Sequence, residues 1–207
     1  MSVDEVFQRI TTALGLAGIE YMLAGSFAST RYSSPRSTQD IDIVISASPE
    51  QLKSLIQDLN GKHYYAELND ALKGHQTGSL FNVIDIDTGW KIDLIFRKST
   101  AFGLEEFRRR RKIEIHGLSL FVASPEDVII SKLAWAKEGA SQRQIEDAAA
   151  VLSVQGQSLD REYLEKGFLI SDLQSNGRRP GKLPDPVNDS PSQASIQLAC
   201  QCICQPR

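Results

Sequence analysis

The sequence predicts an α/β fold, with a mixed sheet flanked by helices and a small helical C-terminal part. The run DIDIVI at 40–45 alternates polar and apolar residues and is rich in β-branched side chains, as strands are. Segments with apolar residues at helical spacing lie on either side of it, at 3–16 and after Pro49. From Ser124 onward the recurring pattern is helical only.

The remaining elements follow from local patterning. The first half is predicted to contain a helix at 3–16, a strand at 19–24, a helix at 27–32, a strand at 40–45, and a helix opened by Ser48 and Pro49. A short helix within 67–73 precedes a β-meander with strands at 79–85, 90–96, 112–115 and 118–122. Helices are then predicted from Ser124 to Lys137, at 142–152 and at 160–166.

Composition divides the chain into three parts. Residues 1–122 form the predicted core, and 123–167 form a helical part of the same domain. Residues 168–207 form a tail dense in Gly, Pro, Ser and Gln, which cannot bury enough apolar surface to offset its ordering entropy. We therefore expect disorder from about residue 171 onward.

The bulk properties exclude several classes of protein. The net charge of -3 provides no global basic field of the kind that marks a general nucleic-acid binder. No stretch reaches the roughly 18 apolar residues that a membrane-spanning helix needs. The N-terminal residues carry early acids and lack the apolar core of a signal peptide. We expect a cytoplasmic protein that does not contact membranes.

Three aspartates are the candidate catalytic and metal-ligating residues. Asp40 and Asp42 are two apart on a predicted strand, so their carboxylates project from the same face. Asp93 lies inside the otherwise apolar run KIDLIF, where an acid is unfavourable unless it is paired or ligating. Carboxylate oxygens suit Mg²⁺ or Mn²⁺, and two such ions can activate an attacking oxygen and stabilise a leaving one.

Gly25 and Ser26 are the candidate phosphate-binding residues. They follow the predicted strand IEYMLA and precede a helix. A glycine at a strand end permits close backbone approach, and the free N–H groups of a helix N-terminus attract anions. A nucleoside triphosphate would fit there, with Ser26 contacting a phosphate oxygen.

The string LAGSFASTRYSSPRSTQDIDIVI combines Gly-Ser, Arg-x-Thr-x-Asp-x-Asp and the strand that carries the two acids. It resembles the DNA polymerase β-like nucleotidyltransferase superfamily and, within it, the AbiEii-type branch. FNVID, WKIDLIF and ASPEDVIISKLAW extend the resemblance over roughly residues 5–165. It implies an enzyme that transfers NMP from an NTP to an RNA (tRNA-like) or protein acceptor, and a toxin with a cognate antitoxin. A non-catalytic member that binds a nucleotide or a partner protein is the alternative.

The resemblance also implies further nucleotide-binding residues, namely Arg36, Thr38 and Lys132. Arg36 would meet a phosphate, or would pair with one of the nearby aspartates. Lys132 would contact the triphosphate, and Asp147 would orient Lys132 or bind substrate; alternatively, both would be ordinary surface residues. The basic run at 108–112 is either a solvated helix end or a contact with an RNA backbone.

Overall fold

The computed structural model describes residues 3–33, 38, 40–62, 64–115, 117–139 and 141–175, without the side chains of residues 138 and 169–175. These residues form two compact units. Unit 1 comprises those within Met1–Ala28 and Arg36–Ser124, and unit 2 comprises those within Ser29–Pro35 and Pro125–Arg207. Within the described ranges, no helix is long and apolar enough to cross a membrane.

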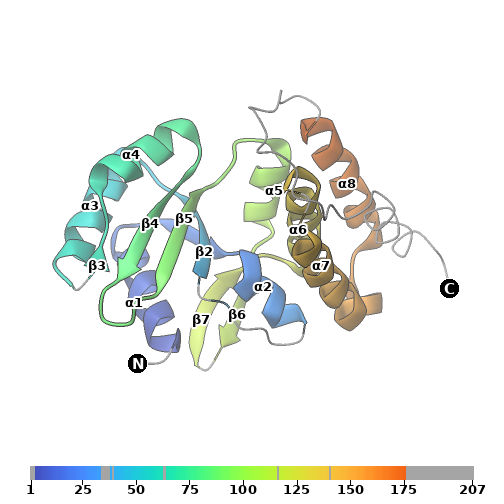
Figure 1. Ribbon diagram of the computed structural model, residues 1–207, viewed down its shortest axis with the longest axis horizontal. Coiled ribbons are helices and arrows are strands. Elements are labelled where there is room, and N and C mark those ends of the chain that lie inside the picture. Colours follow the sequence, from blue (N-terminus) through green and yellow to red (C-terminus); the bar gives the residue numbers. More distant parts are fainter. Residues whose placement is uncertain are drawn as a thin grey trace. The chain divides into compact units, whose positions relative to one another are not determined.

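Unit 1 is built on a seven-stranded mixed sheet with the order β3-β4-β5-β2-β1-β7-β6 (Figure 1). The strands are β1 (Glu20–Leu23), β2 (Asp40–Ser46), β3 (Tyr64–Tyr65), β4 (Leu80–Asp85), β5 (Lys91–Phe96), β6 (Arg111–Ile115) and β7 (Leu118–Val122). The predicted mixed sheet is confirmed, but the predicted meander is wrong. The β4–β5 and β6–β7 hairpins lie in opposite halves of the sheet, because β5 pairs in parallel with β2 and β7 pairs in parallel with β1.

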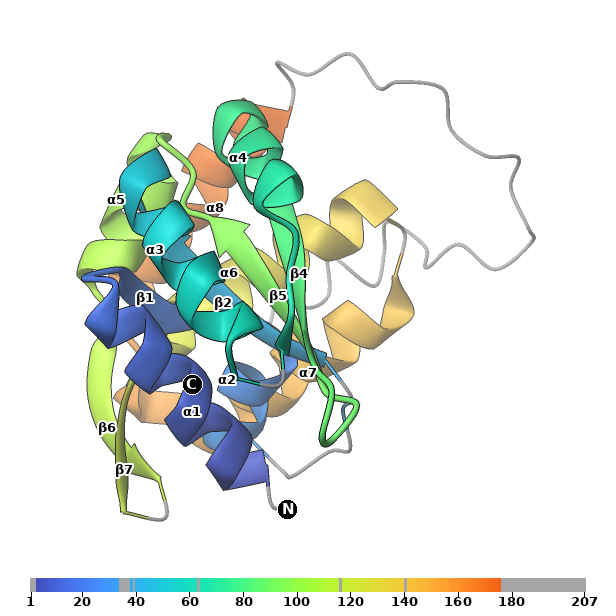
Figure 2. The ribbon, with the colours of Figure 1, turned by 90° about the vertical axis from the view of Figure 1, so that its left-hand side faces the viewer.

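Helices α1 (Val3–Leu16), α3 (Pro49–Asn60) and α4 (Leu68–Thr77) cover one face of this sheet (Figure 2). The start of α3 confirms the predicted cap. The Ser48 hydroxyl accepts a hydrogen bond from the Gln51 backbone N–H, and the Gln51 side chain accepts one from the Ser48 N–H. Such a reciprocal cap satisfies backbone donors that the first helical turn leaves free.

The core of unit 1 lies between these helices and the sheet. Its fully buried side chains come from alternate positions of the central strands and from the apolar stripes of two helices, namely Ile41, Ile43, Ile45, Ile92, Leu94, Ile10, Leu14, Leu52, Leu55 and Leu59. Because side chains alternate across a strand, the other face of β2 and β5 carries the polar residues between them.

Helix α5 (Ala101–Arg108) was not predicted from the sequence. Gly103 within it weakens the local helical signal, since glycine lowers helix propensity. In the structure this glycine permits close packing, because a Cβ there would lie 2.6 Å from the Lys98 carbonyl oxygen. The Thr100 hydroxyl caps the helix by accepting the Gly103 N–H at 3.1 Å.

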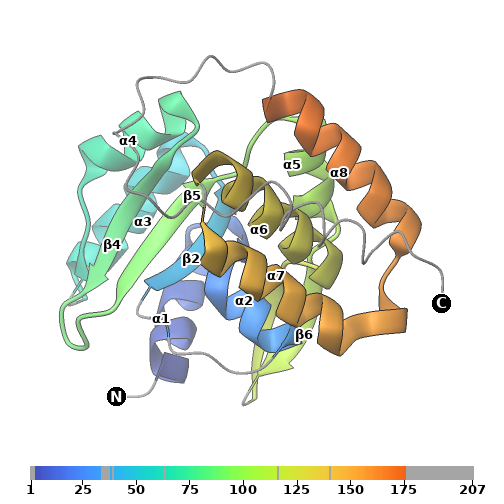
Figure 3. The same ribbon diagram turned by 45° about the vertical axis from the view of Figure 1, so that its right-hand side comes forward.

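Unit 2 is helical. Its long helices are α6 (Pro125–Gly139), α7 (Gln142–Gln155) and α8 (Arg161–Ser175). The short 3₁₀ turn η1 (Gly156–Ser158) lies between α7 and α8. Both α7 and α8 pack on α6 (Figure 3). The second half of α2 (Gly25–Tyr32) also belongs to this unit, where the Gln155 side chain donates to the Tyr32 carbonyl oxygen at 3.0 Å.

The structure corrects the predicted end of the last helix and the start of the tail. Helix α8 continues to Ser175, so residues 168–175 are not part of a disordered tail. Gly167 does not end the helix; it provides room for α6, because a Cβ there would lie 2.3 Å from the Ile130 Cδ1 atom. The tail predicted beyond residue 175 lies outside the described residues.

Two buried acids at the start of α6 fix α8 in place. Glu126 accepts the Asp160 backbone N–H at 3.1 Å, and Asp127 accepts the Tyr163 hydroxyl at 2.6 Å. Both acids are buried, and each has the hydrogen-bond partner that a buried carboxylate needs.

Candidate active site

The three candidate aspartates occupy one face of two adjacent strands. Asp42 on β2 is the register partner of Asp93 on the parallel strand β5, and Asp40 is the register partner of Lys91. Adjacent strands lie about 4.8 Å apart, so the Asp42 and Asp93 backbones are immediate neighbours. The interleaved Ile41 and Ile43 point into the core, which leaves the carboxylates on the face opposite α1, α3 and α4. We call this surface the acidic face.

Gly25 lies directly against the acidic face. It adopts φ +57, and a Cβ at this position would lie 1.9 Å from Asp42 Oδ2 and 2.8 Å from Asp42 Cβ. The preceding residue, Ala24, donates its N–H to the Asp42 carbonyl oxygen at 2.9 Å. The end of β1 therefore brings the first residues of α2, Gly25 and Ser26, beside the Asp42 carboxylate, with the glycine required by both φ and space.

Two residues that sequence analysis missed hold the Asp93 carboxylate. The Asn82 side-chain amide donates to Oδ1, and the Lys91 ammonium donates to Oδ2 at 3.0 Å. Lys91 could have been found from its spacing, because it is two residues before Asp93 and thus on the same face. Asn82 could be found only from the β4–β5 register, in which it is opposite Asp93.

The Lys91 ammonium lies in the field of all three aspartates. Its hydrogen bond to Asp93 raises the pKa of Lys91, and the charges of Asp93, Asp40 and Asp42 act in the same direction. The side chain of Lys91 is half-exposed, whereas that of Asp93 is largely buried. A half-exposed cation thus offsets part of the negative charge of the acidic face.

The residues present fit a hard divalent cation by their donor chemistry. In the described part of the chain, no group of three or more His, Cys, Asp or Glu side chains is arranged as metal ligands. On the acidic face, the Asp93 carboxylate is engaged by the Asn82 amide and the Lys91 ammonium. All three acids offer carboxylate oxygens, which Mg²⁺ and Mn²⁺ prefer, and their charges already act on one cation, the Lys91 ammonium bound to Asp93.

Thr38 lies just before the acidic face. Its hydroxyl donates to the Asp40 carbonyl oxygen at 3.3 Å, so its visible contact is with the start of β2. Arg36, predicted to meet a phosphate or an aspartate, lies outside the described residues.

Lys132 and Asp147 meet inside unit 2. The Lys132 ammonium donates to Asp147 Oδ2 at 2.8 Å, which joins α6 to α7. Lys132 is 5% exposed and Asp147 is 9% exposed, so neither is an ordinary surface residue. The structure thus brings these two predicted residues together, and their approach to a nucleotide stays a prediction.

The basic run after α5 is largely engaged within unit 1. Arg108 donates twice to the Glu105 carboxylate, at 2.8 and 2.6 Å. Arg110 donates to Glu20 at 2.6 Å and stacks over the rings of Phe107 and Phe121. For these two arginines, the structural interpretation fits better than a contact with an RNA backbone.

The fold is that of known nucleotidyltransferases. The structure of ANT(2'')-Ia in complex with adenylyl-2''-tobramycin has a TM-score of 0.56 at 15% identity, covering 83% of this chain and 97% of that chain. The lincomycin-bound lincosamide antibiotic adenylyltransferase LnuA has a TM-score of 0.52 at 15% identity, covering 74% of this chain and 98% of that chain. At these identities the likeness establishes the fold alone.

No curated protein matches the sequence. A family model does, over residues 5–178, with the description "Nucleotidyltransferase of unknown function (DUF6036)". This confirms the resemblance to nucleotidyltransferases, whereas the AbiEii-type branch stays a prediction. Because the match spans most of the sequence, the chain belongs to this family of nucleotidyltransferases.

Proposed function

We propose that this protein is a metal-dependent nucleotidyltransferase that transfers NMP from an NTP to an acceptor hydroxyl. The observation that carries the proposal is the acidic face, where Asp42 and Asp93 are in register on parallel strands with Asp40 beside them. Gly25 is packed against Asp42 at the start of a helix, as an anion-binding turn beside a metal site would be. Membership of a nucleotidyltransferase family supports the same reaction class.

Each residue of the acidic face has a proposed role. Asp40, Asp42 and Asp93 would hold Mg²⁺ or Mn²⁺, which when bound lowers the charge of the triphosphate and acidifies the acceptor hydroxyl. Asp93 would also accept the proton of that hydroxyl. The acceptor oxygen forms a bond to the α-phosphorus, and the bond from that phosphorus to pyrophosphate breaks. Gly25 and Ser26 would bind the β- and γ-phosphates through the N-terminus of α2.

Lys91 and Asn82 add two positioning roles to this scheme. Asn82 orients the Asp93 carboxylate through the hydrogen bond to Oδ1. Lys91 stabilises the acidic face before a divalent cation binds and is released from Asp93 when one does. Because its side chain is half-exposed, it can leave without a burial cost.

Arg36, Thr38 and Lys132 are further candidates for contacts with the nucleotide. For Lys132, the support is its burial with an acid that fixes its ammonium, since a held ammonium is a defined point charge for phosphate. Thr38 would act from the segment that leads into β2. All three roles rest on the AbiEii-type resemblance of the sequence, as does a toxin function with a cognate antitoxin.

The acceptor is proposed to be an RNA (tRNA-like) or a protein, as that resemblance implies. A second candidate is a small molecule, which one cavity of unit 1 favours. This cavity of about 400 Å³ adjoins Asn82 and is lined by the exposed Tyr65 and Ile84 and by the acids Glu67 and Asp70. Its size is within the ~300–1,000 Å³ range of ligand sites. ANT(2'')-Ia with adenylyl-2''-tobramycin and LnuA with lincomycin are antibiotic-bound proteins of this fold.

The test is the transfer of label from each α-³²P-NTP with Mg²⁺, in the presence of total tRNA, protein lysate or small hydroxylated amines. The Asp42→Asn variant preserves the shape of the side chain and removes its charge. Glu114→Gln makes the same change at an exposed position of β6 and is the matched control. We expect label in one acceptor fraction with wild type and Glu114→Gln, and none with Asp42→Asn.

A non-catalytic member that binds a nucleotide or a partner is the alternative function. It would bind ATP in a Mg²⁺-dependent manner and label no acceptor fraction. Equal labelling by Asp42→Asn and wild type would refute the proposed role of the acidic face.

A further inference from the structure

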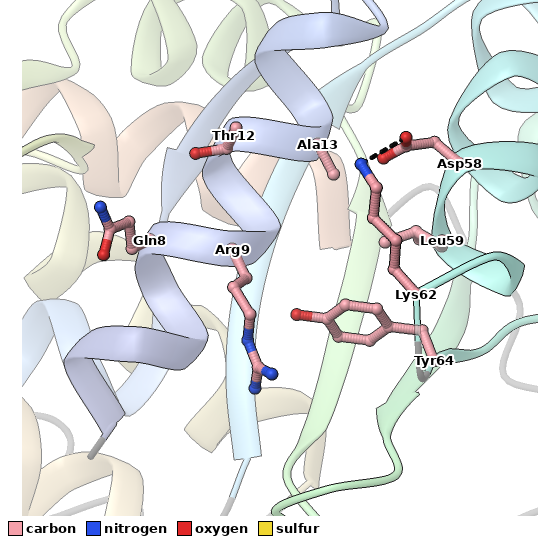
Figure 4. A pocket seen from close by; sticks show the side chains of 8 residues that line it. All are labelled: Gln8, Arg9, Thr12, Ala13, Asp58, Leu59, Lys62 and Tyr64. Carbon is pink, nitrogen blue, oxygen red and sulfur yellow. Dashed lines mark hydrogen bonds and ion pairs between the residues drawn. The ribbon is translucent and has the colours of Figure 1, made fainter. Parts of the chain in front are cut away.

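The two outer strands of the unit 1 sheet offer edges of different length. At one end, β3 pairs with β4 over two residues, and a cavity of about 280 Å³ lies among β3, α1 and the end of α3. Figure 4 shows Tyr64 of β3 extending toward α1, and Lys62 joined to Asp58 of α3. At the other end, β6 pairs with β7 over five residues and is the last strand of the sheet (Figure 1). The β6 edge is therefore the longer template for a further strand.

Two residues of β6 turn their backbone hydrogen-bonding groups toward this edge. The N–H of Ala123, just after β7, donates to a carbonyl oxygen of β1 at 2.9 Å. Backbone groups alternate in direction along a strand, so Val122 points its own toward β6, and its register partner Arg111 points back. By the same alternation, Lys112 and Glu114 turn their N–H and C=O groups away from β7.

The side chains of β6 alternate in chemistry along the same edge. Those of Lys112 and Glu114 are exposed and share one face of the strand. Among the residues that the structure describes, neither side chain has an ion-pair partner. Ile113 and Ile115 lie on the other face and are half-buried, although Leu120, the register partner of Ile113, is fully buried. The edge thus combines one cation, one anion and incompletely covered apolar side chains.

This pattern is complementary to itself in one register. Two copies related by a two-fold axis pair antiparallel, and their outward residues must lie opposite one another for the backbone groups to bond. An axis at Lys112 places two lysines opposite each other, and an axis at Glu114 places two glutamates opposite each other. An axis at Ile113 places Lys112 of each copy opposite Glu114 of the other. Opposite charges stabilise a cross-strand pair and like charges destabilise it, so the axis at Ile113 is favoured.

We propose that β6 binds β6 of a second copy of this chain in that register, which joins the two seven-stranded sheets into one. Each copy donates two backbone hydrogen bonds and accepts two, at Lys112 and Glu114, and the two Ile113 side chains cover each other. A strand of this length gives a small interface, so we expect a weak dimer with a Kd of about 10–100 μM.

The dimer is independent of the proposed transfer reaction. The three aspartates lie on β2 and β5 of a single chain, so pairing at β6 leaves the acidic face unchanged. Glu114→Gln therefore weakens the pairing and remains a valid control for transfer.

The test is sedimentation velocity of the full-length protein at about 1–300 μM, a range that spans the expected Kd. Lys112→Glu and Glu114→Lys each place like charges opposite each other at both contacts, so each should raise the Kd about tenfold or more. The two changes shift the net charge in opposite directions, so an effect of net charge alone would weaken one dimer and strengthen the other. Lys53→Glu, at an exposed position of α3, is the matched control and should leave the Kd unaltered.

A mixture of the two reversed variants tests the register directly. Equal amounts of Lys112→Glu and Glu114→Lys again place a cation opposite an anion at both contacts, so they should form heterodimers with about the wild-type Kd. The double variant Lys112→Glu/Glu114→Lys should form homodimers for the same reason.

Three results would each overturn the inference. They are a wild-type protein that stays monomeric throughout the concentration range, a dimer whose Kd neither reversal changes, and a mixture of the reversed variants that stays monomeric. None of them bears on nucleotidyl transfer, because no residue of the acidic face is changed.

Discussion

The Gly25→Ala variant tests whether the glycine beside Asp42 is needed to keep the Asp42 carboxylate in place. A Cβ at Gly25 would lie 1.9 Å from Asp42 Oδ2. The carboxylate would have to move by about 1.5 Å or more to regain ordinary van der Waals separation. The side chain cannot simply rotate away, because Asp42 Cβ would also be only 2.8 Å from the new methyl group.

The matched control is Gly78→Ala. Gly78 has φ +63, close to the +57 of Gly25, but a Cβ there would meet no atom within 4 Å. Each alanine should lose about 1–2 kcal/mol of unfolding free energy from the left-handed backbone alone. The clash at Gly25 should add about 1–3 kcal/mol. Displacement of a metal-binding carboxylate by more than an ångström should lower transfer activity about 100-fold.

The assay measures both quantities on the same variants, with urea denaturation for stability and initial rates of NMP transfer for activity. We expect Gly78→Ala to lose stability and keep its activity, and Gly25→Ala to lose both. If Gly25→Ala is no more impaired in transfer than Gly78→Ala, the placement of Gly25 against a catalytic Asp42 is refuted.

Three further predictions concern stability. Lys132→Met removes the ammonium that pairs with the buried Asp147 and should lower the unfolding free energy by about 3–5 kcal/mol. Most of this loss should be recovered in Lys132→Met/Asp147→Leu, and an unaffected urea midpoint of the single variant would contradict the prediction. Gly167→Ala should destabilise by about 1–3 kcal/mol through the clash with Ile130, whereas Gly15→Ala in the open should stabilise α1 by up to about 1 kcal/mol. If urea denaturation showed that Gly167→Ala is more stable than wild type, the close α6–α8 packing would be refuted. Burial raises the pKa of Tyr64 to about 12, so its neutral form stabilises the fold below pH 10, and this contribution is lost as the pH rises from 10 to 12. Tyr64→Phe should flatten that decline in stability, and an unchanged pH profile would contradict it.

Much of the fold could be predicted because its signals are local. The alternation of DIDIVI and KIDLIF determines which residues of β2 and β5 face the core, and thereby places the three aspartates on one face. Ser48 and Pro49 determine the start of α3 in the same local way. These patterns depend on residues a few positions apart, which a sequence displays directly.

The rest depends on contacts between distant segments. Asn82 lies opposite Asp93 because of the β4–β5 register. The β4–β5 and β6–β7 hairpins lie in different halves of the sheet because β5 pairs with β2, whereas β7 pairs with β1. Two helices that contain a glycine were the other source of error: α5 was not predicted, and α8 was predicted to end at residue 166. Gly103 in α5 and Gly167 in α8 each allow a neighbouring segment to approach closely. Glycine breaks an isolated helix, and only the packing shows where that cost is offset.

The most direct test of the central claim is Mg²⁺-dependent transfer of label from α-³²P-NTP by wild type and by Asp93→Asn. In the proposed mechanism Asp93 links the metal site to the acceptor. In Asp93→Asn the carbonyl oxygen can keep the hydrogen bond from the Asn82 amide, and the half-exposed Lys91 ammonium can turn from the new NH₂ group to solvent, so the fold should persist. We predict that wild type labels an acceptor, that EDTA abolishes labelling, and that folded Asp93→Asn transfers none. Full activity of Asp93→Asn would contradict the account.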